Sequence, residues 1–333
     1  MRGPWSGPAR PVELRRPVRY LLVAGTLALL STAIPDPVPG LATAAPVPPA
    51  PAVIASPAGP SPGSSCTKIE GSLRPSGALP APGAMPAGST MAAIVARGRL
   101  IVGVDQGDYL SGFRDPATAN LQGADIDVAR MVAQALFGDP NRIQFVVLSV
   151  ADRADALRQG RVDLVSDVYT VTCQRQQQVA FSTDYLQVSQ RLLVPANSDV
   201  REAEDLRGRP VCTSRNSAPE DVLHRLKLNV QPAAGISACM VELQRGRVAA
   251  ISTDDTLLAG MAAQDPQVRV VGRSLDAARY ALAMPLQHQD LVRFVNAVLE
   301  RGRADGSLAA IDRRWYGKVL DPVPMPPPAN YRD

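Results

Sequence analysis

Aromatic residues and histidines are scarce in this chain. Phe, Trp and Tyr together make up 4% of it, and there are two histidines, His224 and His288. Proteins that bind single-stranded nucleic acids by base stacking need more aromatic side chains, so no nucleic-acid partner is expected. Both histidines lie in polar stretches without an evident acid–base partner, and the sequence holds no HExxH or P-loop motif. An enzyme is therefore not expected.

Cysteine is also rare, with four residues in the chain, and none of them forms a CxxC pair. This spacing argues against a zinc or redox site, so neither a metal nor a cofactor is expected. An even number of cysteines behind an export signal is typical of two disulfides, for which the sequence allows three pairings. Free buried thiols are the alternative.

An export signal is indicated near the N-terminus. Residues 15–34 place a basic cluster before a mostly apolar run, which is typical of a signal peptide, and small residues at 42–44 offer a cleavage site. The run is short for a membrane span, although an uncleaved anchor remains an alternative. The first cysteine, Cys66, follows too late for a lipoprotein. We expect a signal peptide or anchor over residues 1–45, and a protein at the extracytoplasmic face of the membrane, secreted or tethered.

The next segment is rich in proline, alanine and glycine. Residues 1–90 hold 18 of the 31 prolines, and such a stretch buries too little apolar surface to repay its ordering entropy. Residues 46–90 are therefore predicted to form an extended tether, and residues 321–333 a proline-rich tail. Of the net charge of +4, residues 1–40 contribute +3. The nearly neutral remainder does not predict a phosphate-binding surface.

Between residues 91 and 320 short strands alternate with helices. Residues 100–104 form an apolar run, which predicts a buried strand. Residues 125–137 carry apolar side chains at helical spacing, which predicts a helix. The same alternation returns between residues 210 and 263. This order predicts an α/β fold with mostly parallel sheets, in which ligands bind at the carboxyl ends of strands.

Five motifs in order carry a family resemblance: GRLIVGVDQGDYLSGFRDPATANLQGADIDVA, DALRQGRVDLV with YTVTCQRQQQVAFSTDYL, EDLRGRPVCTSRNS, ISACMVELQRGRVAAISTDD and DGSLAAIDRRWYG. Over about residues 94–317 the chain resembles the family 3 extracellular solute-binding proteins, the polar amino-acid receptors of ABC importers. Within that family it is most similar to actinobacterial glutamine/glutamate-binding proteins, including the mycobacterial one.

The resemblance implies a type II periplasmic-binding fold, in which two α/β lobes are joined by a two-segment hinge. Residues 91–186 and 278–320 would form lobe 1, and residues 187–277 lobe 2. A monomer would bind a polar amino acid, Glu/Asp or Gln/Asn, between the lobes and deliver it to an ABC permease. The alternative is a sensor or scaffold that signals to a membrane protein, with a degenerate site.

The resemblance also implies roles for individual residues. Arg175 would bind the α-carboxylate with two N–H groups, together with Thr170 and Thr172. Otherwise it is a surface arginine on a polar helix. Asp254 would bind the α-ammonium group, or cap the following helix. Arg153 matches an arginine of the glutamate/aspartate-type members, and would contact the ligand side chain unless it is merely solvated.

Other positions depart from the family pattern. Arg215 and Ser217 stand in a loop where the family reads R-G-T, and both are candidate ligand residues. The family's aromatic cover after the first strand is missing, so Tyr109 and Tyr169 are candidates to replace it. Negative charge is added near Arg153 at three further positions, which puts the ligand's identity in doubt: Asp105, Asp108 and Asp167.

The two lobes implied by the resemblance also suggest how the cysteines pair. Cys212 and Cys239 would both lie in lobe 2 and could link it internally. Cys66 would then pair with Cys173 and hold the tether against lobe 1. Each bond would stabilise the fold by a few kcal/mol in the chain-entropy model.

Overall fold

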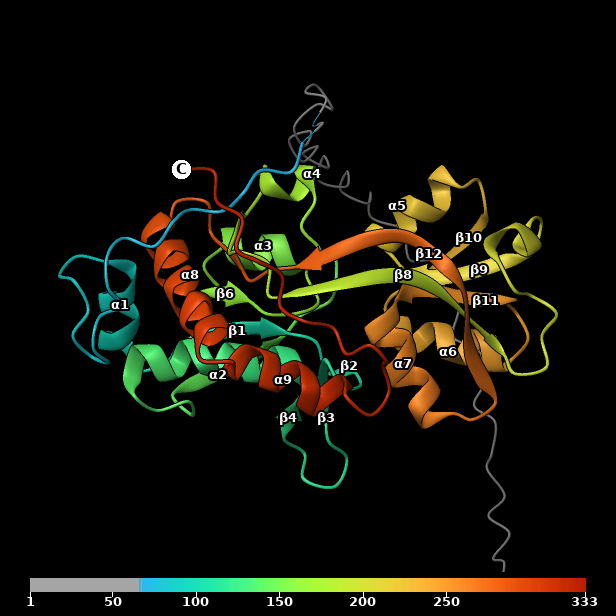
Figure 1. Cartoon of the computed structure of the whole chain (residues 1–333), viewed down its shortest axis with the longest axis horizontal. Coiled ribbons are helices and arrows are strands. Elements are labelled where there is room, and N and C mark those ends of the chain that lie inside the picture. The colour runs from blue at the N-terminus through green and yellow to red at the C-terminus, as the bar shows by residue number, and fades with distance from the viewer. Residues whose placement is uncertain (1–65, 67) are drawn as a thin grey trace, which may run out of the picture. The chain divides into compact units, whose positions relative to one another are not determined.

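The computed structural model describes residue 66 and residues 68–333 (Figure 1). The predicted signal peptide or anchor and the first part of the predicted tether, residues 46–65, lie outside this part of the chain. Within it, no helix combines the length and apolar composition that crossing a membrane requires.

Lobe 1 is built on a five-stranded sheet. Its order is β5 (Ile143–Val147), β1 (Leu100–Val104), β6 (Leu164–Val165), β13 (Ala283–Met284) and β7 (Ala180–Phe181). β1 runs parallel to β5 and β6, whereas β13 is antiparallel to its two neighbours. β1 reads Leu-Ile-Val-Gly-Val and is almost wholly buried, as expected of a parallel strand covered on both faces.

Helices cover both faces of this sheet. The larger core packs α1 (Thr90–Arg97), α2 (Ala124–Phe137), α8 (Gln289–Ala304) and α9 (Ser307–Tyr316) against one face, as Figure 1 shows. α3 (Arg153–Arg158) packs on the other face. α8 is amphipathic because its apolar residues recur at helical spacing, and their side chains are buried: Leu291, Val292, Phe294, Val295, Val298 and Leu299.

A small three-stranded antiparallel sheet extends from lobe 1 toward lobe 2. It comprises β2 (Gly107–Asp108), β3 (Gly112–Arg114) and β4 (Leu121–Gln122). α4 (Cys173–Gln176) is a single turn between β6 and β7.

Lobe 2 repeats the α/β plan. Its sheet has the order β10 (Asn229–Ala233), β9 (Pro210–Ser214), β11 (Ala250–Asp254), β8 (Leu186–Pro195) and β12 (Val268–Tyr280). Separate apolar clusters pack against the sheet. Its helical elements are η1 (Ala203–Leu206), α5 (Ala218–Arg225), α6 (Ile236–Gln244) and α7 (Asp255–Gln264). The predicted α/β class is thus confirmed.

The two lobes are joined by β8 and β12, which pair antiparallel along most of their length (Figure 1). Leu186 pairs with Tyr280 at the lobe 1 end, and Pro195 pairs with Val268 at the far end. The register shifts between Val271 and Asp276. The boundaries predicted at residues 186 and 278 fall at the start of β8 and near the end of β12.

The end of the predicted tether is packed against lobe 1. Ser72 forms a bridge with Tyr331 of the C-terminal tail, and the Asn296 Nδ2 of α8 donates to the Ser72 Oγ at 2.8 Å and to the Leu73 carbonyl at 2.6 Å. The Leu73 side chain is buried in the lobe 1 core. Residues 68–89 therefore differ from an extended tether, because Leu73 and main-chain hydrogen bonds anchor them.

Both predicted disulfides are present. Cys66 bonds to Cys173 with Cα atoms 5.6 Å apart, and Cys212 bonds to Cys239 at 5.5 Å. The first bond links the N-terminal segment to α4, and the second links β9 to α6 inside the core of lobe 2. None of the four cysteines is free.

Candidate functional site between the lobes

A cavity of about 60 Å³ lies between the lobes, at the carboxyl ends of strands from both sheets. Asp105 follows β1, Ser214 ends β9 and Asp254 ends β11. Because parallel strands of each sheet point the same way, their ends bring these residues to one place. The residues that line it from lobe 1 include Asp105, Asp108, Arg153, Thr170 and Arg175.

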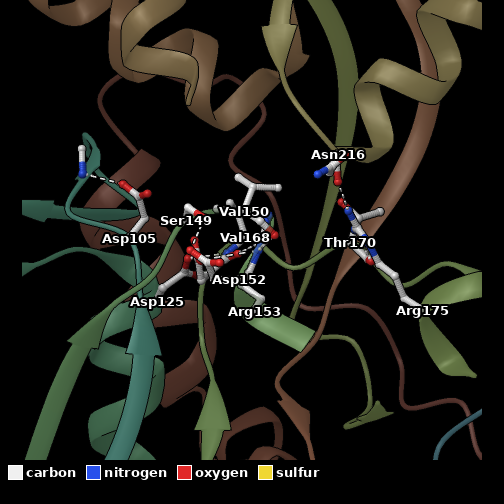
Figure 2. Close-up of polar contacts among 12 residues, drawn as sticks. Asp105, Asp125, Ser149, Val150, Asp152, Arg153, Val168, Thr170, Arg175 and Asn216 are labelled. Atoms are coloured by element: carbon white, nitrogen blue, oxygen red, sulfur yellow. Dashed lines mark hydrogen bonds and ion pairs between the residues drawn. The ribbon is translucent and has the colours of Figure 1, made fainter. Parts of the chain in front are cut away.

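Arg175 lies at one side of this cavity (Figure 2). Its main-chain N–H donates to the Oγ1 of Thr172, which caps α4. Its guanidinium donates to the Thr170 carbonyl at 2.8 Å and, across the cleft, to the Asn216 carbonyl of lobe 2 at 3.2 Å. Burial, and then the positive charge of Arg153, lower its pKa to about 10. A guanidinium has five N–H donors, so donors remain for an anion.

Asp254 faces the same cavity from lobe 2. Its Oδ2 accepts a hydrogen bond of 2.6 Å from the hydroxyl of Tyr280, which lies on the hinge strand β12. Its buried Oδ1 has no hydrogen-bond partner within the described residues, and the side chain does not cap α7. Burial raises the pKa of this carboxyl to about 6. The free oxygen can accept a hydrogen bond from a ligand N–H, whereas the alternative role as a helix cap is not seen.

Arg153 differs from Arg175 because its hydrogen bonds stay within lobe 1 and its guanidinium faces a carboxylate. The side chain is 3% exposed. It donates to the carbonyls of Asp167 at 2.5 Å and Val150 at 3.2 Å, and its Nε lies 3.6 Å from the Oδ2 of Asp167. Figure 2 shows Arg153 between Asp105 and Arg175. Both guanidinium groups also lie over the ring of Tyr169, at 4.6 Å for Arg153 and 4.9 Å for Arg175, a favourable cation–π arrangement.

Three carboxyl groups gather beside Arg153. One oxygen from each of Asp105, Asp108 and Asp167 lies within 4.8 Å of the others. Burial, followed by the charge of Asp105, raises the pKa of Asp108 well above its usual value. Burial raises the pKa of Asp167 to about 8, although Arg153 opposes the shift. Among the described residues, these three carboxyl groups have oxygens close enough together to hold a cation.

Asp125 supports this cluster from α2. It accepts hydrogen bonds from the Tyr185 hydroxyl at 2.6 Å and from the Val168 N–H at 2.8 Å. Burial raises its pKa to about 6. The sequence predicts no role for Asp125, because nothing local indicates that an aspartate in the first turn of α2 is buried.

The remaining predicted residues are divided between the cavity and its surroundings. Ser217 lines the cavity and caps α5, where its Oγ accepts from the Glu220 N–H. Thr172 caps α4 and does not line the cavity. Arg215 does not line it either, since its side chain is exposed and donates to the Pro232 carbonyl at 3.2 Å.

Tyr109 stands at an adjacent cavity of about 300 Å³, between β2 and helices α6 and α7. Its ring packs on Phe113 at 4.9 Å. Sequence reasoning missed several wall residues that carry no charge or motif: Ser149, Val150, Ser214, Ala234, Gly235 and Leu257.

Two further contacts hold the lobes together around the cavity. The Ser237 hydroxyl of α6 donates to the Gly107 carbonyl of β2 at 3.0 Å. Gly260 of α7 lies so close to Tyr109 that a Cβ at this position would be 2.5 Å from the Tyr109 carbonyl oxygen. The conformation is therefore a closed one, in which a small ligand would be enclosed by both lobes.

Comparisons with known proteins agree with this architecture. Residues 100–318 match the model of the bacterial extracellular solute-binding proteins, family 3. The glutamine-binding protein of Geobacillus stearothermophilus is 32% identical over 58% of this chain and 75% of its own length. The ABC transporter glutamine-binding protein of Bacillus subtilis is 27% identical over 68% of this chain and 84% of its own.

Solved structures show the same fold. An ancestral arginine-binding protein bound to arginine superposes with a TM-score of 0.61 and 29% identity, covering 66% of this chain and 99% of that one. An ancestral arginine-binding protein bound to glutamine gives a TM-score of 0.62 and 28% identity, covering 66% of this chain and 99% of that one. The expected two-lobed periplasmic-binding fold is confirmed. The chain belongs to family 3 of the bacterial extracellular solute-binding proteins, which bind solutes and are not enzymes.

Proposed function

We propose that this protein binds a free polar amino acid in the cavity between its lobes and delivers it to an ABC permease at the outer face of the membrane. The observation that carries the proposal is the pair of opposite charges in one small cavity. Arg175 offers unused N–H donors, and Asp254 offers a buried oxygen without a donor. A zwitterion supplies the carboxylate and the ammonium that these groups need, since an unpaired buried charge is costly.

The relatives support this proposal. Their names include glutamine-binding proteins, one of them from an ABC transporter. The side chains suggested by the sequence are those of Glu, Asp, Gln and Asn. An acidic side chain fits the cavity poorly, because Arg153 is paired with Asp167 and two more carboxyl groups stand beside it.

The two lobes also provide a mechanism for ligand-dependent closure. Arg175 belongs to lobe 1 and Asp254 to lobe 2, so one amino acid held by both would hold the lobes together. Tyr280 of the hinge strand β12 is hydrogen-bonded to Asp254. The ligand's ammonium is thereby coupled to the strand about which the lobes move.

The test is isothermal titration calorimetry with the twenty amino acids on wild type, Arg175→Ala and Asp254→Asn. Each substitution leaves one ligand charge buried and unpaired, so we expect binding to weaken by at least about 100-fold, or about 3 kcal/mol. Arg215→Ala is the matched control, since it removes an arginine outside the cavity, and its affinity should equal that of wild type. Unchanged binding to Arg175→Ala would show that the ligand's carboxylate lies elsewhere.

A further inference from the structure

The charges in the cavity do not balance once a zwitterion is placed there. This step rests on the proposed function, in which Arg175 and Asp254 bind the ligand's main-chain groups. Three carboxyl groups then remain in the cluster of Asp105, Asp108 and Asp167, and Arg153 is the cation that faces them. The region next to the ligand's main chain therefore holds more acid than base.

The orientation of Arg153 increases this imbalance for a ligand. Its Nε–H and one Nη1–H donate to the Val150 and Asp167 carbonyls, and its Nε faces the Asp167 carboxylate. Asp105 accepts a hydrogen bond from the Gly107 N–H at 2.5 Å, but the Asp167 Oδ2 has no hydrogen-bond partner within the described residues, and Asp167 is 2% exposed. When its carboxyl groups are ionised, the acidic cluster therefore lacks donors, while acceptors are plentiful.

This pattern discriminates between polar side chains. A glutamine amide has two donors, but it also has a carbonyl oxygen that needs a donor in return. A glutamate would bring a fourth carboxylate to the cluster, and like charges at this distance repel. An ammonium or guanidinium group carries donors only and a positive charge, which is what the cluster lacks.

The space around the cluster favours a long side chain. The interlobe cavity of about 60 Å³ shares Asp108, Ile236 and Leu257 with the adjacent cavity of about 300 Å³. Asp108 therefore stands where the two cavities meet, beside the apolar side chains of Ile236 and Leu257. The methylene groups of a long side chain can contact Ile236 and Leu257 while its charged end reaches Asp108.

We propose that the ligand is an amino acid with a cationic side chain, such as arginine, lysine or ornithine, whose charged end lies against the cavity-lining carboxyl groups of Asp105 and Asp108, next to the buried Asp167.

The raised pKa values agree with this assignment. Burial and neighbouring carboxyl groups raise the pKa of Asp108 well above its usual value and that of Asp167 to about 8, so protons compete with a cationic ligand for the cluster. Charged groups that act on Asp167 come from four other elements or their ends: Asp105, Asp125, Arg153 and Arg175. Affinity for arginine should therefore rise from about pH 6 to about pH 8.5, whereas affinity for glutamine should not.

The experiment measures the affinity of the whole purified protein for arginine, lysine, glutamine and glutamate by titration. Its Tm is measured separately with and without CaCl₂. We expect arginine or lysine to bind at least about tenfold more tightly than glutamine, and glutamate least well. Asp108→Asn should lower the affinity for arginine at least about tenfold more than it lowers the affinity for glutamine. Asp199→Asn, at an exposed position of lobe 2, is the matched control.

The possible results separate this inference from the proposed function. If glutamine binds more tightly than arginine and Asp108→Asn has no effect, the cationic side chain is refuted while amino-acid binding stands. If CaCl₂ alone raises Tm and Asp108→Asn abolishes that rise, the cluster is a metal site and the inference is refuted. If no amino acid binds the folded protein, the proposed function itself fails.

Discussion

At the scale of single residues, neighbouring side chains of one type have different roles because their partners differ. Arg153 and Arg175 both lie over the ring of Tyr169. The first is buried against Asp167, and its hydrogen bonds lie inside lobe 1. The second contacts main-chain carbonyls of both lobes and keeps donors for a ligand. The sequence names both arginines, but their partners lie in other segments of the chain.

Adding a single methyl group at Gly260 provides a test of lobe closure. A Cβ there would lie 2.5 Å from the Tyr109 carbonyl oxygen in the other lobe. Alanine is a better helix former than glycine by about 1 kcal/mol. For Gly260→Ala we therefore expect an unchanged or higher Tm without ligand but at least about tenfold weaker ligand binding, as measured by calorimetry, because closure is obstructed.

Gly302→Ala is the matched control for Gly260→Ala. Gly302 is also a helical glycine, and its added Cβ would meet the flexible end of Met131 within lobe 1. Its affinity should equal that of wild type. Equal ligand affinity in wild type and Gly260→Ala would mean that the close contact at Tyr109 is not needed for binding.

At the scale of elements, the site depends on short helices that begin where strands end. α4 has a single turn, which is too short to be stable by itself. It is held by the Thr172 cap and by the disulfide from Cys173 to Cys66. Gln176 of α4 exchanges two hydrogen bonds with the main chain of Glu70 in the N-terminal segment. The N-terminal segment therefore supports the element that carries Arg175.

Removing the Cys66–Cys173 bond should affect binding as well as stability. The chain-entropy model assigns about 4.8 kcal/mol to a bond with this sequence separation of 107 residues. For Cys66→Ala combined with Cys173→Ala we expect a lower Tm and weaker ligand binding, because α4 loses a support. Differential scanning calorimetry and ligand titration measure the two effects.

The second disulfide is the comparison for this variant. Cys212 and Cys239 are separated by 27 residues and packed in the core of lobe 2, and the same model gives about 3.6 kcal/mol. Their double alanine variant should lose stability without a specific change at Arg175. If both double variants bind ligand equally well at temperatures where they are folded, α4 does not depend on the N-terminal segment.

At the scale of the whole molecule, buried carboxyl groups determine how stability varies with pH. Burial is the main cause that raises the pKa of Asp125 and Asp254 to about 6 and of Asp167 and Asp312 to about 8. The folded state thus binds protons more tightly than the unfolded state, in which these groups titrate near 4. The contribution of these four groups to the free energy of unfolding is therefore largest below about pH 4 and falls as pH rises to the folded pKa values.

We expect Tm of the ligand-free protein to fall between about pH 5 and about pH 8.5, corresponding to a few kcal/mol. Differential scanning calorimetry at constant ionic strength measures this change. Asp312 lies in α9, and its Oδ2 is buried without a hydrogen-bond partner among the described residues. Asp312→Asn should therefore reduce the fall in Tm. A Tm that rises over this range would contradict the assignment of these groups as buried acids.

The sequence by itself determined the α/β class and the family, because both follow from local periodicity and from motifs in a fixed order. The two disulfide pairings were implied by the lobes that the family resemblance assigns. It also located the acidic positions near Arg153. The order of segments such as YTVTCQRQQQ is enough to place Arg175 and its capping threonine together.

Only the tertiary structure decided how these charges are paired. Asp125, Asp167 and Arg153 lie on different elements, and burial and pairing arise when the ends of the strands meet. The same packing left Arg215 exposed and anchored residues 68–89 on lobe 1. Charge balance in a closed cavity depends on contacts between residues far apart in the chain, and the local sequence does not predict those contacts.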